Sequence, residues 1–248
     1  MIAIILAAGY ATRLYPYTKD MPKSLLEVGG KTILARILEK IEPVASVVRT
    51  VLVTNSRFHA LFEAWIADHW RGKPVKILDD GTTTNETRIG AIADLAFAVD
   101  REGITEDVLV LAGDNLFDFE LEDFVNYFHH VGHDAITAHF LADHKALRQT
   151  GVVEVDDKHR VLSFQEKPAL PRSNLAAPPF YIYRRDTLPL VAEYLREGGD
   201  PDAPGSFIPW LIRHRDVYAY LFRGARYDIG TVESYELVKR LFADRRAR

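Results

Sequence analysis

Short apolar runs alternate with amphipathic stretches over the first half of the chain. Four runs of apolar and β-branched residues have the length of buried strands: residues 2–7, 49–54, 75–78 and 107–111. Four stretches repeat apolar positions at helical spacing: residues near 32–41, 57–70, 88–99 and 121–130. Strands that alternate with helices are typical of βαβ units. We therefore predict an α/β fold with a Rossmann-like, mostly parallel sheet flanked by helices.

The pattern changes from residue 134 onward. Strand-like runs follow one another there with few helices between them: DAITAHFL, GVVEVDD, RVLSFQEK and PPFYIYRR. Two later segments have helical spacing, DTLPLVAEYLREG and TVESYELVKRLFADRR. These runs predict a smaller mixed or antiparallel addition in the C-terminal half. No repeat, linker or composition shift marks a boundary, so we predict a single domain over residues 1–248.

Composition narrows the classes of function. The 248 residues carry a net charge of −4, so the chain lacks the basic field that a nucleic-acid partner would need. Cysteine is absent, which excludes a disulfide scaffold, a thiolate metal site and a cysteine nucleophile. No apolar run reaches the roughly 18 residues of a membrane span, and the N-terminus lacks the basic segment of a secretory signal. We expect a cytoplasmic protein without a membrane partner.

The stretch LAAGYATRLYPYTKDMPKSLL, residues 6–26, carries the first chemical signal. Gly9 ends the apolar run, and Arg13 and Lys23 follow on a stretch that contains two prolines. Backbone amides near a glycine can approach anionic oxygens closely, and Arg and Lys neutralise their charge. Ligands of open α/β sheets bind beyond the carboxyl ends of the strands, where this stretch begins. It therefore predicts a phosphate site.

Two carboxylates occupy similar positions further along. Asp114 lies in GDN after the apolar run of the fourth strand, and Asp228 lies in YDIGT before the last helix. Each has a plain alternative as a turn residue or a helix cap. Together with a phosphate loop they would suit Mg²⁺, which keeps several waters and bridges to substrate phosphates.

Two common nucleotide motifs do not fit. The GKT of VGGKT would be part of a phosphate-cradling P-loop only if a glycine stood at Leu25. A dinucleotide fingerprint would need a second glycine at Ala11, and the second strand ends in VTNS without an acid to hold a ribose. An NAD-dependent oxidoreductase is therefore disfavoured.

Six motifs appear in a fixed order along the chain: the opening stretch, VLAGDNLF, TGVVEVDD, FQEKP, SNLAAPPFYIY and YDIGT. With this set the chain resembles the sugar-1-phosphate nucleotidylyltransferases (nucleotide-sugar pyrophosphorylases) over nearly its whole length. It is most similar to the glucose-1-phosphate thymidylyl- and uridylyltransferase type. The resemblance implies an enzyme that transfers a nucleotidyl group, with Mg²⁺ as cofactor, from an NTP to a sugar 1-phosphate and releases pyrophosphate. It favours dTTP or UTP as the NTP.

The resemblance also implies roles for individual residues. Residues 1–133 would form the nucleotide-binding half and residues 134–248 the mainly sugar-binding half. Arg13 and Lys23 would be catalytic, and Asp114 and Asp228 would bind the metal. The implied nucleotide-binding positions are Leu6, Ala8, Gly9, Asp80 and Gly81. The implied substrate-binding positions are Gly151, Glu166, Lys167 and Asn174.

The chain departs from the family pattern at several points. Ala11 replaces the usual second glycine of the loop, Pro179 stands where glycine is common, and Arg226 stands where tryptophan is common. The segment LDDGTTTNETRIGAI lacks the usual base-reading sequence. Two alternatives therefore stay open: a cytidylyltransferase for another phosphorylated alcohol such as phosphocholine, and a nucleotide-sugar sensor without turnover. The sequence also leaves a homo-oligomer open.

Overall fold

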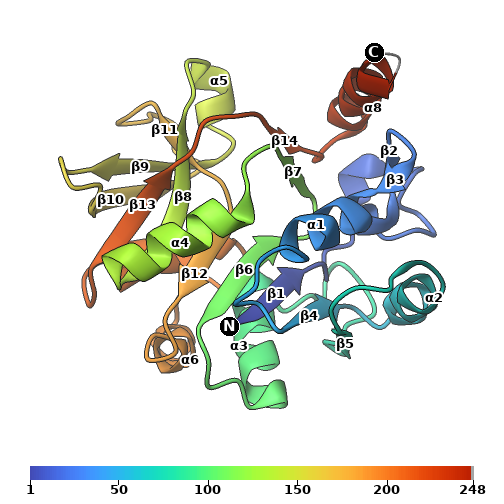
Figure 1. Cartoon of the computed structure of the whole chain (residues 1–248), viewed down its shortest axis with the longest axis horizontal. Helices are drawn as coiled ribbons and strands as arrows, with labels where there is room; N and C mark the ends of the chain where they lie inside the picture. The colour runs from blue at the N-terminus through green and yellow to red at the C-terminus, as the bar shows by residue number, and fades with distance from the viewer. Residues whose placement is uncertain (247–248) are drawn as a thin grey trace.

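Parallel strands form the centre of the sheet in the computed structural model, which describes residues 1–246 (Figure 1). β1 (Ile2–Leu6) lies between β4 (Arg49–Thr54) and β6 (Val108–Ala112), and β5 (Val75–Asp79) pairs with β4. All three pairings are parallel. The strands are rich in apolar residues, as expected where helices cover both faces of a sheet. The predicted parallel α/β core is confirmed.

Helices cover the two faces of this sheet. The buried residues of α1 (Ile33–Ile41), α2 (His59–His69) and α4 (Leu121–Val131) join one apolar cluster. Those of α3 (Ala91–Glu102) and α6 (Leu188–Arg196) join a second cluster. The two clusters take alternate residues of β1, Ala3 and Ile5 in one and Ile2 and Ile4 in the other, so each belongs to one face of the sheet.

The predicted start of α3 at residue 88 was wrong by three positions. Gly90 stands before the helix with φ +97°, a conformation that side chains rarely adopt. A Cβ at Gly90 would also lie 2.5 Å from the carbonyl oxygen of Pro201. The close approach of these two backbone segments therefore sets the helix start.

Antiparallel strands extend the sheet in the second half of the chain. β12 (Phe180–Tyr183) pairs antiparallel with both β6 and β8 (Asp134–Phe140). β11 (Leu175–Ala177), β9 (Gly151–Val155) and β10 (Val161–Glu166) follow outward from β8. The predicted mixed addition is confirmed, and it is continuous with the parallel core because β12 joins β6 to β8.

The sequence pattern did not predict several strands. β13 (Val217–Leu221) was missed, and it pairs parallel with β8. Buried and partly buried residues alternate along its first four positions, as is typical of a strand. β2 (Glu27–Val28) and β3 (Lys31–Thr32) form a small hairpin, and β7 (Asn115–Phe117) pairs with β14 (Arg226–Asp228). Runs of two or three residues are too short for a periodic signal. The remaining elements are η1 (Thr12–Leu14), η2 (Lys23–Leu25), α5 (His144–Leu147), η3 (Pro204–Phe207), α7 (Ile208–Leu211) and α8 (Val232–Arg246).

An aromatic cluster supports the β7–β14 pair. The rings of Phe117 and Phe180 lie 4.6 Å apart, and those of Phe117 and Phe119 also lie 4.6 Å apart. Phe180 is fully buried on β12. The cluster therefore fixes β7, the strand with which β14 pairs, against β12.

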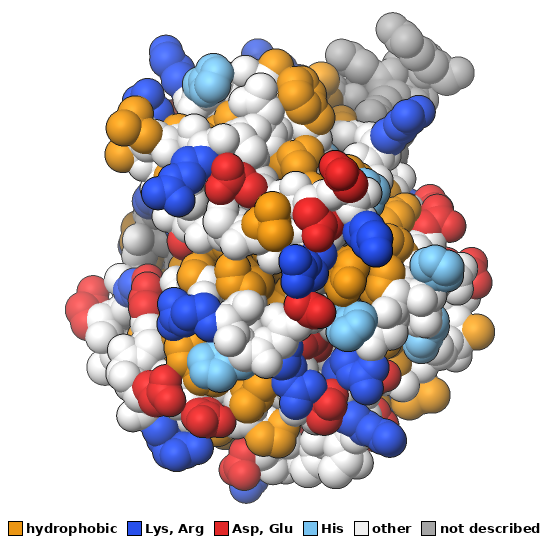
Figure 2. All heavy atoms as spheres, turned by 90° about the vertical axis from the view of Figure 1, so that its left-hand side faces the viewer, with side chains coloured by type: hydrophobic (Ala, Val, Ile, Leu, Met, Phe, Trp, Pro, Cys, Tyr) orange, Lys and Arg blue, Asp and Glu red, His pale blue; other side chains and the backbone are white. Residues whose placement is uncertain are grey.

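The surface mixes charges of both signs. On the face formed by the left-hand side of Figure 1, Lys and Arg side chains are interspersed with Asp and Glu (Figure 2). Within residues 1–246, no helix combines the length and the apolar character needed to cross a membrane.

Phe180→Ala tests the role of the aromatic cluster. We expect the free energy of unfolding to fall by about 3–5 kcal/mol, because the substitution removes a buried ring and leaves a cavity. Urea unfolding of the variant measures this loss. Phe140→Ala is the matched control, because Phe140 is 67% exposed at the end of β8 and should change the free energy by less than about 0.5 kcal/mol. Equal losses in the two variants would contradict the role of the cluster.

Candidate active site

The loop after β1 is tied to both neighbouring strands. Leu6 O accepts a hydrogen bond from Gly113 N at 2.9 Å, and Ala8 O accepts one from Asn55 Nδ2 at 2.8 Å. Gly9 follows and is exposed, and a Cβ placed there would meet no described atom within 4 Å. The backbone at Gly9 therefore faces open space that a ligand can enter.

Ala11 keeps the turn that a glycine would favour. Its φ of +48° and ψ of +41° lie in the left-handed region, which costs an alanine about 1–2 kcal/mol. Its carbonyl accepts hydrogen bonds from Leu14 N at 2.9 Å and Thr18 Oγ1 at 2.8 Å. The departure from the family pattern therefore leaves a glycine-like loop path, and η1 with Arg13 begins at the next residue.

Lys23 and Asp114 form an ion pair across the site. Lys23 Nζ donates to Asp114 Oδ2 at 2.7 Å, and Ser24 Oγ donates to Gly113 O at 2.5 Å. A Cβ on Gly113 would lie 2.9 Å from Ser24 Oγ and 3.0 Å from the Cβ of Ala7, so only glycine fits between the loop and the strand. The sequence predicted both charged residues as site residues, but it did not predict that they pair.

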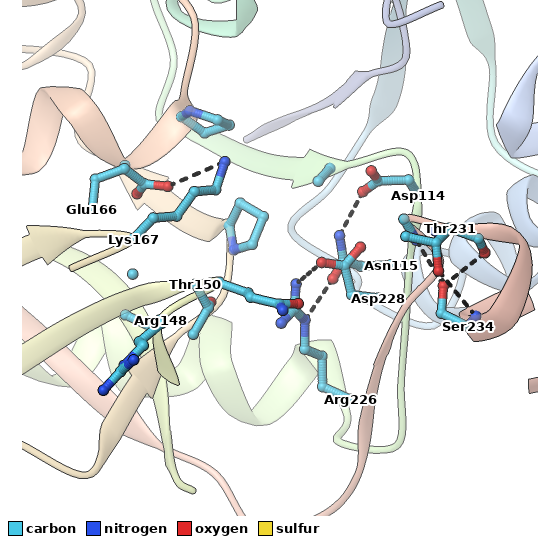
Figure 3. A pocket seen from close by; sticks show the side chains of 18 of the residues that line it. Asp114, Asn115, Arg148, Thr150, Glu166, Lys167, Arg226, Asp228, Thr231 and Ser234 are labelled. Carbon is cyan, nitrogen blue, oxygen red and sulfur yellow. Dashed lines mark hydrogen bonds and ion pairs between the residues drawn. The ribbon is translucent and has the colours of Figure 1, made fainter. Parts of the chain in front are cut away.

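A chain of polar contacts continues from Asp114 to Asp228. Asn115 Nδ2 donates to Asp114 Oδ1 at 2.5 Å, and Arg226 Nε donates to Asn115 Oδ1 at 2.6 Å (Figure 3). The Arg226 guanidinium also lies 3.2 Å from Asp228 Oδ2. The register of β7 and β14 places Asp228 opposite Asn115, so the side chains of both strands lie near Arg226. The structure thus brings the two predicted metal ligands into one network.

The network sets the charge state of Asp114. Burial alone would raise the pKa of this carboxyl, but the charges of Lys23 and Arg226 hold the pKa below its ordinary value. Asp114 is therefore ionised at neutral pH.

Two cavities adjoin at the loop. The smaller cavity, of about 280 Å³, is lined by the loop after β1 and the start of α3, including Leu6, Ala8 and Gly9. The larger cavity, of about 570 Å³, is lined by the ends of β9, β10 and β14, including Gly151, Glu166 and Lys167. The residues common to both linings are Arg13, Lys23, Ala112, Asp114 and Pro204. The two predicted cations therefore stand where the cavities meet.

Glu166 ends β10 and Lys167 follows it, and both line the larger cavity (Figure 3). Their charged groups lie 3.8 Å apart, and burial raises the pKa of Glu166 above its ordinary value. Lys167 has a φ of +44°, and its N–H donates to Thr150 O at 3.2 Å. Strained backbone of this kind persists where the surrounding structure fixes it, often at functional sites.

Three predicted site residues lie outside both linings. Asn174 precedes β11, where its carbonyl accepts from Leu141 N at 2.8 Å. Asp80 and Gly81 follow β5, and Asp80 Oδ1 accepts from Thr82 N at 2.7 Å. The structure does not bring these three residues to the cavities, and their roles stay predictions.

The structure also adds residues that sequence reasoning missed. Arg148 and Ser234 line the larger cavity without a signal in the sequence, and Thr150, which also lines it, begins the motif TGVVEVDD (Figure 3). Arg226 was noticed only as a departure from the family pattern. Asp94 lines the smaller cavity. An acidic residue at a buried position of α3 is unusual, and this could have pointed to it.

The carboxylates of Asp114 and Asp228 fit a magnesium ion. Both line the larger cavity, and both offer the hard oxygen ligands that Mg²⁺ prefers. Across the described part of the chain, no group of three or more His, Cys, Asp or Glu side chains is placed to hold a metal. A Mg²⁺ ion at these two carboxylates would therefore complete its shell with substrate phosphates and water, as is usual for this ion.

The sequence profile of the nucleotidyl transferase family matches residues 2–245. The chain is 29% identical to a glucose-1-phosphate adenylyltransferase of Fervidobacterium nodosum, over 95% of this chain and 59% of that protein. It is 27% identical to the bifunctional protein GlmU of Methanocaldococcus jannaschii, over 93% of this chain and 51% of that protein. The chain thus spans little more than half the length of these relatives.

Two solved structures share the fold. A putative glucose-1-phosphate thymidylyltransferase from Bacillus anthracis, in complex with a sucrose, has a TM-score of 0.77 at 22% identity and covers 98% of this chain and 96% of its own. A UDP-glucose pyrophosphorylase complexed with UDP-glucose has a TM-score of 0.83 at 20% identity and covers 98% of both chains. At these identities the likeness concerns the fold alone.

Asp94→Asn tests the electrostatics of the smaller cavity. Burial and the neighbouring Asp80 raise the pKa of Asp94 to about 8, whereas the unfolded chain releases this proton near pH 4. The folded state then binds more protons between these values, so the stability of the native protein falls as pH rises from 4 to 8. The variant should lose this dependence. The free energy of unfolding of the variant minus that of the native protein should therefore be larger at pH 8 than at pH 4 by a few kcal/mol.

Urea unfolding at several pH values measures the effect. Asp100→Asn is the matched control, because Asp100 is an exposed acid on the same helix. Stability curves for native protein and Asp94→Asn that run parallel from pH 4 to 8 would contradict the raised pKa.

Proposed function

Because the chain belongs to the nucleotidyl transferase family, we propose that it transfers a nucleotidyl group from an NTP to a sugar 1-phosphate. One observation carries the proposal: two cavities share a wall that contains Arg13, Lys23 and Asp114. A reaction that joins two phosphorylated substrates needs such a wall, because both phosphates must meet at the cations. The NTP occupies the smaller cavity and the sugar 1-phosphate the larger one.

The proposed chemistry needs no general base. A sugar phosphate has a second pKa of about 6, by analogy with phosphoserine, so it is mostly a dianion at neutral pH. Its oxygen attacks the α-phosphorus of the NTP, and the bond from that phosphorus to the β-phosphate oxygen breaks. Pyrophosphate leaves with the electron pair. The guanidinium of Arg13 and the ammonium of Lys23 stabilise the charge that builds up on the phosphate oxygens.

We propose that Asp114 and Asp228 hold the Mg²⁺ ion of this reaction. When bound, the ion neutralises charge on the substrate phosphates. Lys23 and Arg226 contact the same two carboxylates, so they hold these side chains in place before substrates arrive. Preorganised charges of this kind avoid a reorganisation cost at the moment of reaction.

The lining of the larger cavity favours a sugar over choline. Arg148, Lys167 and Arg226 bring positive charge to this cavity. A quaternary ammonium is held best between several aromatic faces, and Tyr181 is the one aromatic side chain among the described residues of this lining. Glu166 can accept hydrogen bonds from sugar hydroxyls. We therefore propose a sugar 1-phosphate as the acceptor rather than phosphocholine.

The identity of the NTP is a separate question from that of the acceptor. The sequence favours dTTP or UTP, whereas similar proteins are named glucose-1-phosphate adenylyltransferase. A pyrophosphate-release screen of ATP, CTP, GTP, UTP and dTTP against hexose 1-phosphates and phosphocholine tests the proposal. We expect Mg²⁺-dependent release with at least one hexose 1-phosphate. Nucleotide binding without release in any combination would favour the sensor and overturn the proposal.

Asp114→Asn and Asp228→Asn test the metal pair. Each variant should lose about 10²–10⁴ in kcat, since loss of a charge-stabilising group costs several kcal/mol of the barrier. The double variant should be little worse than the worse single one, because one ion serves both carboxylates. Electron paramagnetic resonance measures the binding of Mn²⁺ in the presence of nucleotide. This binding should weaken in the same variants that lose kcat.

Asp123→Asn serves as the control for these variants, because Asp123 is an exposed acid on α4. It should keep native activity and native Mn²⁺ binding. Retained activity with a lower melting temperature in Asp114→Asn or Asp228→Asn would show that the residue is only a turn or cap residue.

A further inference from the structure

The larger cavity carries more positive charge than the proposed reaction uses. From the described part of the chain, its lining takes the cations Arg13, Lys23, Arg148, Lys167 and Arg226 and the acids Asp114, Glu166 and Asp228. Ion pairs join two of these cations to two of these acids, and Arg13 belongs to the wall that both cavities share. Arg148 and Lys167 remain, with Glu166 as the acid left to balance them.

These two cations have donors to spare. Arg148 is exposed, and its guanidinium makes no hydrogen bond or ion pair with residues 1–246. The ammonium of Lys167 lies 3.8 Å from Glu166 Oε1, which is longer than a hydrogen bond, and the side chain is 61% exposed. Both side chains can therefore donate to a ligand in the cavity without breaking a strong internal contact.

The backbone fixes the place of both cations. Leu147, which ends α5, is fully buried in a small apolar cluster with residues of β9 and β11. Arg148 follows at once, so its position is set by this packing. Lys167 N donates to Thr150 O at 3.2 Å, which joins the segment after β10 to the segment before β9. The two cations thus come from neighbouring, anchored segments.

This pair of cations is remote from the proposed reaction centre. Arg148 precedes β9 and Lys167 follows β10, and these strands form the outer end of the sheet, whereas Asp114 follows β6 near its centre. Figure 3 shows Arg148 and Asp114 on opposite sides of the cavity. Because the 1-phosphate of the acceptor has to meet the NTP at the shared wall, Arg148 and Lys167 face the part of the acceptor that lies away from this phosphate.

We propose that the acceptor is a sugar 1-phosphate with a second anionic group, a carboxylate or a phosphate, and that Arg148 and Lys167 bind this group. An arginine fork can bind either group through two parallel hydrogen bonds, and a lysine adds a point charge. Neutral hydroxyls would leave both charges unpaired. The inference rests on the proposed function and narrows its acceptor.

Pyrophosphate release with two kinds of acceptor tests the inference. Glucose 1-phosphate and galactose 1-phosphate are neutral apart from the reacting phosphate, whereas glucuronic acid 1-phosphate adds a carboxylate and glucose 1,6-bisphosphate adds a phosphate. Each acceptor is combined with each of the five NTPs. The native protein should use at least one acidic acceptor with a kcat/KM tenfold or more above that of both neutral ones. The acidic acceptor that it prefers identifies the anionic group.

Arg148→Gln tests the residue. The variant should lose tenfold or more in kcat/KM for the preferred acidic acceptor, mainly through KM, and should change less than twofold for glucose 1-phosphate, which brings no group to Arg148. Arg148→Lys keeps the charge and should recover part of the loss. Lys145→Gln is the matched control, because Lys145 is an exposed cation of the same short helix outside the lining. It should behave as the native protein.

The outcomes separate the inference from the proposed function. Equal losses for acidic and neutral acceptors in Arg148→Gln would assign Arg148 to the 1-phosphate and overturn the inference. A native protein that uses neutral acceptors as well as acidic ones would also overturn it and would keep the proposed function. No release from any NTP with any of the four acceptors would overturn both.

Discussion

The ion pair between Lys23 and Asp114 is the interaction on which the site depends. It joins the loop after β1 to the end of β6 at 2.7 Å, across 91 residues of sequence. Lys23 has a side-chain exposure of 12% and Asp114 of 38%, so the pair is shielded on one side and open to the cavities on the other. A pair of this kind contributes little net stability after desolvation. Its importance is positional, because it holds a cation and a carboxylate at the boundary between two cavities.

The strands that position this pair were predictable because their signal is local. Long apolar runs predict buried strands, and residues at the ends of parallel strands must lie at one edge of the sheet. Gly9 and Asp114 follow from that rule, and Arg13 and Lys23 follow from it together with the charge that a phosphate site needs. The predicted phosphate loop and the carboxylate therefore lie together in the structure.

Other parts of the site depend on long-range pairing that a pattern cannot show. β7 and β14 have three residues each, and their register places Asp228 opposite Asn115. The close approach of Pro201 to Gly90 sets the start of α3 and with it the position of Asp94. Asn174 shows the opposite case, since a family motif named it and the folded chain does not bring it to either cavity.

The arrangement separates chemistry from selectivity. Reacting phosphates would meet at the shared wall, whereas the base and the sugar would be bound at opposite ends, in the smaller and in the larger cavity. A crystal structure of the protein with a bound nucleoside diphosphate hexose tests this division most directly. We predict that the diphosphate contacts Arg13 and Lys23, the base lies in the smaller cavity and the hexose lies in the larger one. A ligand confined to one cavity, or a diphosphate away from these cations, would contradict the division.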